Sequence, residues 1–313
     1  MSKLKLYAEL ARPFTLVAPA LGFVSGALTA IGAHPREPFT FEVLTPALIG
    51  AAMAAIFNAG SNALNQIYDL EIDRINKPKR PLTSGRMTIS EAWAFTWVAY
   101  ALTLILAWFV APGGRHECFW IVAIAVVATW IYSAPPLRTK QRGMWANITI
   151  AIPRGVLLKV AGWSAVKTIY GDEPWFIGAI FALFLVGAAS TKDFADIPGD
   201  RAGGCRTPPI LYGVRKAAWI ISPFFVFPWL LLPVGAWVRD PQQPSHPILT
   251  GDPILLTALG LLLTAWGIYT VWLILRDPDS LAKVENHPSW KHMYLMMMAA
   301  QIGFALAYVI RIK

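Results

Sequence analysis

The stretch from residue 41 to residue 73, FEVLTPALIGAAMAAIFNAGSNALNQIYDLEID, decides the fold class. Its first part, Val43–Ala63, is a charge-free run long enough to cross a hydrocarbon core of about 30 Å, which takes about 20 residues of helix. Its second part carries a polar stripe on one helix face, because at 3.6 residues per turn the following positions align: Asn58, Asn62, Asn65, Asp69 and Asp73. Polar groups in a membrane helix must face protein or water, so the stripe predicts an interior cavity.

Seven further apolar runs meet or approach the same length: Phe14–Gly32, Ala92–Ala111, Phe119–Ala134, Trp175–Ala189, Ala217–Val238, Ile254–Leu275 and Met293–Ile310. A ninth run, Met144–Val166, contains Arg154 and Lys159, and its neighbours favour a crossing lined by protein. Of the 313 residues, 56% are hydrophobic and only 14% are charged, against about a quarter in soluble domains. This composition excludes a disordered chain and a conventional cytosolic enzyme. We therefore predict an all-α polytopic membrane protein with nine transmembrane helices.

The basic residues predict the orientation of these helices. With nine crossings, nineteen Lys and Arg residues fall on the side of the N-terminus and six on the side of the C-terminus. Because cytoplasmic loops are enriched in Lys and Arg, we expect the N-terminus in the cytoplasm and the C-terminus on the opposite side. The formal charge of +9 then follows from topology, and no nucleic-acid partner is needed to explain it.

Acidic residues follow the second and sixth runs in matching patterns. The segment Asp69–Arg74 aligns with Asp196–Arg201 at a shift of 127 residues, and each contains Asp-x-x-x-Asp. We infer two four-helix pseudo-repeats, roughly residues 12–134 and 144–275, with a ninth helix at 291–311, in a single domain covering 1–313. Asp193 shares a helix face with Asp196, whereas Pro198 and Gly199 are expected to break the helix before Asp200.

Two carboxylate clusters beside basic loops predict a diphosphate site at a membrane surface. Mg²⁺ prefers oxygen ligands and commonly bridges carboxylates to phosphates. Arg80 and Arg201 are candidate phosphate ligands, while topology alone accounts for Lys77, Lys79, Arg142, Arg215 and Lys216. For Asn58, a purely structural role in hydrogen bonding between helices remains equally open.

The same residues resemble a known family. The run from Asn65 to Gly85, NQIYDLEIDRINKPKRPLTSG, resembles the N-x-x-x-D-x-x-x-D signature of the intramembrane UbiA-type prenyltransferases, and 192–201, KDFADIPGDR, resembles their second signature. The segment 132–140, YSAPPLRTK, is similar to the tyrosine and basic segment after their fourth span, and Arg12-Pro13 to the start of their first. The resemblance covers the chain from residue 12 to the last span.

This resemblance implies nine helices around a central cavity and Mg²⁺-dependent transfer of a prenyl group from a prenyl diphosphate to an acceptor. It assigns one metal ion to Asn65, Asp69 and Asp73, and a second to Asp196 and Asp200. Diphosphate binding falls to Arg80, Arg138, Lys140 and Arg201, with Arg12 nearby. Tyr132 would face the allylic cation, and Asp193 would support the metal ligands or deprotonate the acceptor. We further expect Arg154 or Lys159 to point into the cavity, towards an anionic group of the acceptor or an Asp motif, rather than to serve structure alone.

The sequence also bears on the acceptor class and on two rival functions. The Asn65–Asp69 run and Pro153-Arg154-Gly155 favour the homogentisate-type and lipid-glycerol branches of the family. A secondary transporter also uses repeats and buried charges, but it binds ions near the membrane midplane, whereas these Asp groups lie at span ends. A phosphatidyl-group transferase would carry its aspartates in one motif. The expected partners are the two substrates and membrane lipid, and the sequence identifies no protein partner.

Overall fold

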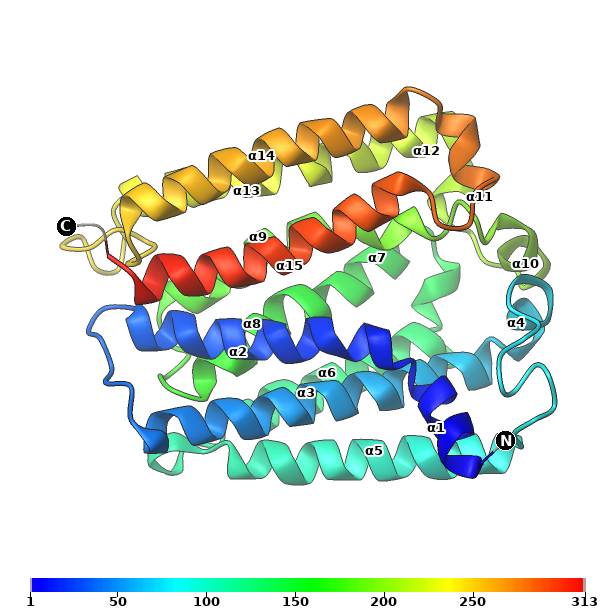
Figure 1. The fold of residues 1–313 in the computed structure, drawn as a ribbon, viewed down its shortest axis with the longest axis horizontal. Coiled ribbons are helices and arrows are strands. Elements are labelled where there is room, and N and C mark those ends of the chain that lie inside the picture. Colours follow the sequence, from blue (N-terminus) through cyan, green and yellow to red (C-terminus); the bar gives the residue numbers. More distant parts are fainter. Residues whose placement is uncertain (1, 312–313) are drawn as a thin grey trace.

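The computed structural model describes residues 2–311, whose long helices lie side by side in a bundle (Figure 1). Within this range, seven helices are long and apolar enough to cross a membrane. They are α2 with the turn before it (Pro13–Gly32), α3 (Phe41–Tyr68), α5 (Ile89–Phe109), α9 with the turn after it (Asp172–Thr191), α12 to α13 (Val214–Trp237), α14 (Pro253–Leu275) and α15 (Pro288–Val309). No strand occurs among the described residues, as the all-helical prediction requires.

Two further helical segments lie within the same bundle (Figure 1). One is α6 (Glu117–Ser133), which is apolar but shorter than the other helices. The second is a composite of α7 (Met144–Ala151), a π-helical turn (Ile152–Leu157) and α8 (Leu158–Ser164). Pro153 lies in the π-helical turn, where a wider backbone ring accommodates a residue that cannot donate a hydrogen bond. Seven of the nine expected crossings therefore meet the length and hydropathy criterion outright.

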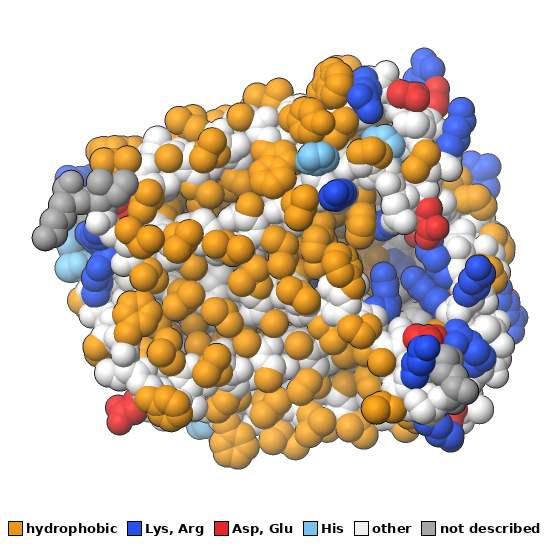
Figure 2. Space-filling model, viewed as in Figure 1, with side chains coloured by type: hydrophobic (Ala, Val, Ile, Leu, Met, Phe, Trp, Pro, Cys, Tyr) orange, Lys and Arg blue, Asp and Glu red, His pale blue; other side chains and the backbone are white. Residues whose placement is uncertain are grey.

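Short helices gather at one end of the bundle. They are α1 (Lys3–Ala11), α4 (Leu70–Asn76), α10 (Ile197–Ala202) and α11 (Pro208–Tyr212). The chain starts at this end, and α15 finishes at the other (Figure 1). Figure 2 shows hydrophobic side chains over most of the visible face and Lys and Arg concentrated at the end with the short helices. A broad apolar surface between charged ends is the surface of a protein embedded in lipid.

The packing of the long helices rests on apolar clusters and close backbone contacts. One cluster centres on Phe184, Phe225 and Trp229, and a second joins Phe23 of α2 to neighbouring helices that include α8. A Cβ placed on Gly26 of α2 would lie 2.7 Å from the carbonyl oxygen of Lys159 in α8. Small residues that allow such close approach are typical of helix contacts in membranes.

Amide side chains of α3 hold the N-terminal segment in place. The side-chain amide of Asn62 donates to the carbonyl of Ala11 at 2.9 Å, and that of Gln66 donates to the carbonyl of Leu10 at 2.8 Å. Asn58 donates to the carbonyl of Thr15 at 3.1 Å. The first two bonds satisfy carbonyls at the end of α1, where the chain turns at Arg12 with a φ of 58°, and the third satisfies a carbonyl in the turn Pro13–Leu16. The structural alternative for Asn58 is therefore the one found.

Candidate active site

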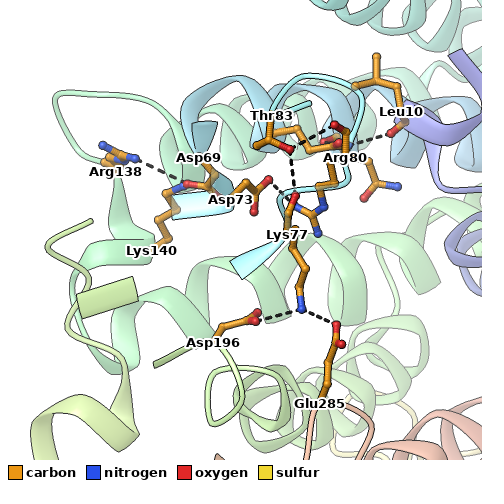
Figure 3. A network of polar contacts seen from close by, with 12 residues as sticks. Leu10, Asp69, Asp73, Lys77, Arg80, Thr83, Arg138, Lys140, Asp196 and Glu285 are labelled. Carbon is orange, nitrogen blue, oxygen red and sulfur yellow. Dashed lines mark hydrogen bonds and ion pairs between the residues drawn. The ribbon is translucent and has the colours of Figure 1, made fainter. Parts of the chain in front are cut away.

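The first acidic segment begins where α3 ends. Tyr68 is the last residue of α3, and Asp69 leaves helical geometry before α4 begins at Leu70. Asp69 and Asp73 are almost fully buried, with exposed fractions of 9% and 6%. Asp73 pairs with Arg80, and Asp69 pairs with Lys140 (Figure 3). Burial of two carboxylates here requires such basic partners.

Arg138 adds a second cation beside Asp69. Its Nη2 lies 3.6 Å from Asp69 Oδ1 and donates to the carbonyl of Tyr68 at 2.7 Å. Arg138 has a φ of 37°, a left-handed conformation that is uncommon outside glycine and that turns the loop after α6 towards α3. Local backbone geometry and the two contacts thus direct this guanidinium to the first acidic segment.

The second acidic segment follows α9. Asp193 lies in a turn, Asp196 immediately precedes α10, and Asp200 lies within α10. Asp196 Oδ1 lies 3.3 Å from Lys77 Nζ (Figure 3). Lys77 comes from the end of α4, so a basic residue of the first segment neutralises an acid of the second.

The two segments are also joined by direct hydrogen bonds. The side-chain amide of Asn76 donates to the carbonyl of Asp196 at 2.9 Å, and the amide of Gly199 donates to Asn76 Oδ1 at 3.0 Å. Gln141, on the loop after α6, donates to the carbonyl of Gly203 at 2.8 Å. Three loops that are distant in the sequence therefore form one assembly at the end of the bundle.

Burial and mutual repulsion govern the titration of the acids. Burial raises the pKa of Asp193 to about 8, with Asp200 and Asp196 adding to the shift. Burial likewise raises the pKa of Asp200 to about 7, reinforced by Asp196 and opposed by Lys140. The pKa of Asp73 is raised by burial, although Arg80 opposes the shift. Burial is the largest cause of all three shifts, so these carboxyl groups lie where their charged form is disfavoured unless a cation is close by.

A hollow opens beside this assembly, and Lys and Arg side chains line its mouth (Figure 2). Tyr132 of α6 interacts electrostatically with Asp193, Asp200 and Arg154. Arg154 lies in the π-helical turn of the composite helix, and its side chain is exposed. Arg12 is also exposed, and its charge interacts with those of Arg154, Arg80, Asp73 and Asp196.

The structure leaves three of the expected residues outside these contacts. Lys159 is buried elsewhere, where its Nζ donates to Ser25 Oγ at 2.8 Å and lies 4.3 Å from the ring centre of Phe181. Arg201 is exposed on α10. Asn65 is half-buried at the end of α3, one turn before Asp69, and its carbonyl accepts the Asp69 amide.

Sequence reasoning missed three residues that hold the assembly together. Lys77 was attributed to topology, although it pairs with Asp196 and with Glu285, whose Oε1 lies 2.6 Å from Lys77 Nζ. Burial alone would lower the pKa of Lys77, but these carboxylates outweigh burial and raise it. Asn76 lies within the first signature, but its position in the sequence does not indicate what its side chain contacts. Glu285 carried no signal, because it lies far from both signatures in the sequence.

The donor set fits Mg²⁺ shared with a substrate. In the range 2–311, no three acidic, histidine or cysteine side chains are grouped closely enough to hold an ion by themselves. Mg²⁺ usually takes only one or two carboxylates and completes its shell with water and substrate phosphates. Pairs such as Asp69 with Asp73 and Asp196 with Asp200 are therefore suited to ions that a diphosphate also binds.

Comparison with known proteins places this site in a family. Residues 21–287 match the model of the UbiA prenyltransferase family. The chain is 28% identical over 316 residues to digeranylgeranylglyceryl phosphate synthase of Thermococcus kodakarensis, covering 98% of this chain and 99% of that one. It is 27% identical over 272 residues to the chloroplastic 2-acyl-4-prenylphloroglucinol 6-prenyltransferase of Humulus lupulus, covering 84% of this chain and 63% of that one.

The fold matches solved structures of the same class. A UbiA homologue from Archaeoglobus fulgidus, solved bound to GPP and Mg²⁺, superposes with a TM-score of 0.71 at 20% identity, covering 97% of this chain and 99% of that one. At this identity the match concerns the fold. From the family match over most of the chain, the protein is an intramembrane prenyltransferase. It belongs to the UbiA prenyltransferase family, as the sequence resemblance indicated.

Proposed function

We propose that this enzyme transfers a prenyl group from a prenyl diphosphate to an aromatic or lipid acceptor, with Mg²⁺ bound and diphosphate released. The observation that carries the proposal is the meeting of the two acidic segments. Lys77, which follows α4, lies 3.3 Å from Asp196 of the second half, and Asn76 ties the two segments together. A site of this kind would hold a ligand with several charged oxygens, and a diphosphate has that chemistry.

Each acidic segment is proposed to supply the ligands of one metal ion. Asn65, Asp69 and Asp73 would hold one Mg²⁺, and Asp196 with Asp200 a second. Bound Mg²⁺ would neutralise the charge that develops on the diphosphate oxygens as the C–O bond breaks. Arg80, Arg138 and Lys140 already contact Asp73 or Asp69, so they stand within reach of an anion held between the segments. Arg201 and Arg12 would add positive charge for binding the same anion.

The cavity supplies the remaining requirements of the reaction. An allylic cation must be kept from water, and apolar helices exclude it. The ring of Tyr132, at the end of α6 that leads to the Arg138 loop, would face this cation. Arg154, an exposed cation on the composite helix, would bind an anionic group of the acceptor. Asp193 sits beside Asp196 and Asp200, where it would support their orientation or accept the proton of the acceptor.

We also propose nine crossings, with the acidic segments and N-terminus in the cytoplasm and the two pseudo-repeats at residues 12–134 and 144–275. The opposite placement of the two chain ends in Figure 1 supports an odd number of crossings. A reporter that is active only in the cytoplasm, fused to the C-terminus, should be inactive. Activity of that reporter would contradict this topology.

One preparation distinguishes the enzyme from a transporter. Purified protein in proteoliposomes should transfer radiolabelled prenyl groups to an acceptor from a panel that includes geranylgeranylglyceryl phosphate and homogentisate. EDTA should stop transfer and Mg²⁺ should restore it, and Mn²⁺ titration followed by electron paramagnetic resonance should count two bound ions. Transfer that persists in EDTA, or solute uptake without transfer, would reject the proposal.

A further inference from the structure

Glu285 lies outside both acidic motifs, in the loop between the 3₁₀ turn Pro278–Ala282 and α15. Its Oε1 lies 2.6 Å from Lys77 Nζ, and the same Nζ lies 3.3 Å from Asp196 Oδ1 (Figure 3). Lys77 therefore divides its charge between two carboxylates. One of them belongs to the second acidic motif, and the other belongs to neither motif.

The position of Glu285 is set independently of Lys77. Lys192, at the start of the second acidic segment, donates to the carbonyl of Glu285 at 3.2 Å and to Asn286 Oδ1 at 2.9 Å. The Lys192 ammonium also lies 4.1 Å from the ring centre of Trp290 in α15. The loop is thus fastened to the second acidic segment, and Glu285 offers Lys77 a fixed partner beside Asp196.

These contacts create competition for the Asp196 carboxylate. A lysine ammonium and Mg²⁺ are attracted by the same negative charge, so a lysine paired with Asp196 opposes metal binding there. The hydrogen bond to Glu285 is shorter than the contact with Asp196, so it draws Lys77 towards the loop. Removal of the Glu285 charge would leave Asp196 as the only acidic partner of Lys77 among the contacts described.

We propose that Glu285 is a positioning residue that shares Lys77 with Asp196, keeps Lys77 from pairing with Asp196 alone, and so sets the Mg²⁺ affinity of the second acidic motif. The proposal rests on the function proposed above. The effect should be modest, because the Glu285 side chain is 64% exposed and exposed ion pairs are weak. We expect a change of about threefold in the metal dissociation constant, because exposed ion pairs contribute little.

A direct effect of the Glu285 charge on a bound cation is the alternative to an effect transmitted by Lys77. By that route, loss of a negative charge near the site would weaken cation binding whatever residue stands at position 77. Such a direct effect would persist after Lys77 is replaced, whereas an effect transmitted by Lys77 would vanish. Asp279→Asn provides the matched control, because Asp279 lies in the preceding turn and pairs at 2.7 Å with Arg215.

The test measures metal binding directly, without substrate. Full-length protein in nanodiscs is titrated with Mn²⁺, and Mg²⁺ competition is followed by electron paramagnetic resonance. Glu285→Gln should weaken binding about threefold, Lys77→Met should not weaken it, and the double variant should bind like Lys77→Met. Asp279→Asn should bind like wild type. With saturating Mg²⁺, Glu285→Gln should keep its kcat within twofold.

The outcomes distinguish the role of Glu285 from the proposed function. Equal binding by wild type and Glu285→Gln would overturn the role of Glu285 alone. That role is also overturned if Glu285→Gln weakens binding as much in the Lys77→Met background as in wild type. Absence of metal binding by wild type would overturn both the role of Glu285 and the metal-dependent function. Thermal unfolding of each variant, monitored in parallel, should stay at the wild-type temperature, because Glu285→Gln preserves the shape of an exposed side chain.

Discussion

Asn76 and Gly199 fit together with no room for a methyl group between them. A Cβ built on Gly199 would lie 2.5 Å from Asn76 Cγ, while the Gly199 amide donates to Asn76 Oδ1 at 3.0 Å. Asn76 ends α4 and Gly199 lies in α10, so this contact sets the separation of the two short helices that carry Asp73 and Asp200.

Gly199→Ala should therefore disrupt the site although alanine is the better helix former by about 1 kcal/mol. The added methyl must displace Asn76, and we expect kcat/KM for prenyl transfer to fall at least about tenfold, since small misplacements of catalytic groups are costly. Gly171→Ala is the control, because its backbone is extended and nothing lies within 4 Å of a Cβ there. Full activity of Gly199→Ala would show that the separation of α4 and α10 is not critical.

Replacement of each repeated aspartate by asparagine isolates the electrostatic contribution. Asn preserves shape but removes the charge that attracts a metal ion. We expect kcat to fall about 10²-fold or more, equivalent to about 2.7 kcal/mol of transition-state stabilisation, in each of Asp69→Asn, Asp73→Asn, Asp196→Asn and Asp200→Asn. The exposed Asp277→Asn should retain wild-type turnover. Substantial activity in the Asp69→Asn/Asp196→Asn double variant would refute a two-metal site.

Asp193 should behave differently from the repeated aspartates. Burial and the neighbouring acids raise its pKa to about 8, so the carboxyl group is mostly protonated at pH 7 and ionises only as the pH rises through 8. Asn mimics the protonated form, so Asp193→Asn should lose less than about tenfold in kcat at pH 7, with a larger loss above pH 8. A pH–rate profile from 6 to 9 tests this, and a pH-independent 10²-fold loss would contradict it.

The two basic residues of the composite helix should separate in their effects on substrate binding. Arg154 is exposed and is proposed to bind an anionic group of the acceptor, so Arg154→Met should raise at least one substrate KM about tenfold. Lys159 contacts Ser25 and Phe181 away from the acids, so Lys159→Met should leave both KM values within twofold. Kinetics with the two substrates varied separately provide the measurement. A raised KM in Lys159→Met, with unchanged thermal unfolding, would restore Lys159 as a substrate ligand.

Much of this architecture could be predicted from the sequence, because apolar length and polar spacing are local signals. The charge-free run Val43–Ala63 predicts a membrane helix whatever surrounds it. The spacing of Asp69 and Asp73 places them on one face, and the Asp73 amide donates to the Asp69 carbonyl at 2.7 Å even though α3 ends at Tyr68 and α4 begins at Leu70. The matching pattern at Asp196 and Asp200 indicated the second half of the site.

The rest of the site depends on contacts that spacing does not encode. Asn58 and Asn62 continue the stripe of Asp69, yet Asn62 binds the end of α1 and Asn58 the turn that follows it, because the carbonyls there need donors. Lys77 and Lys79 are indistinguishable as loop charges, and only the folded loops bring Lys77 to Asp196 and Glu285. Lys159 and Arg154 are five residues apart on the composite helix, yet Lys159 is buried against Ser25 whereas Arg154 is exposed.

The buried Lys159 has a consequence for the insertion of the protein into the membrane during its synthesis. A lysine or arginine at the centre of a nascent segment costs about 2.5–3.5 kcal/mol during insertion by the translocon, and the segment from Met144 to Ser164 carries one of each. The hydroxyl that receives Lys159 belongs to Ser25, in a helix synthesised long before. We expect this segment to enter the bilayer efficiently only when α2, which carries Ser25, is already present beside it. Glycosylation mapping of nascent chains should show poorer insertion of this segment after deletion of residues 1–32. Equal insertion would show that the contact between Lys159 and Ser25 plays no part in insertion.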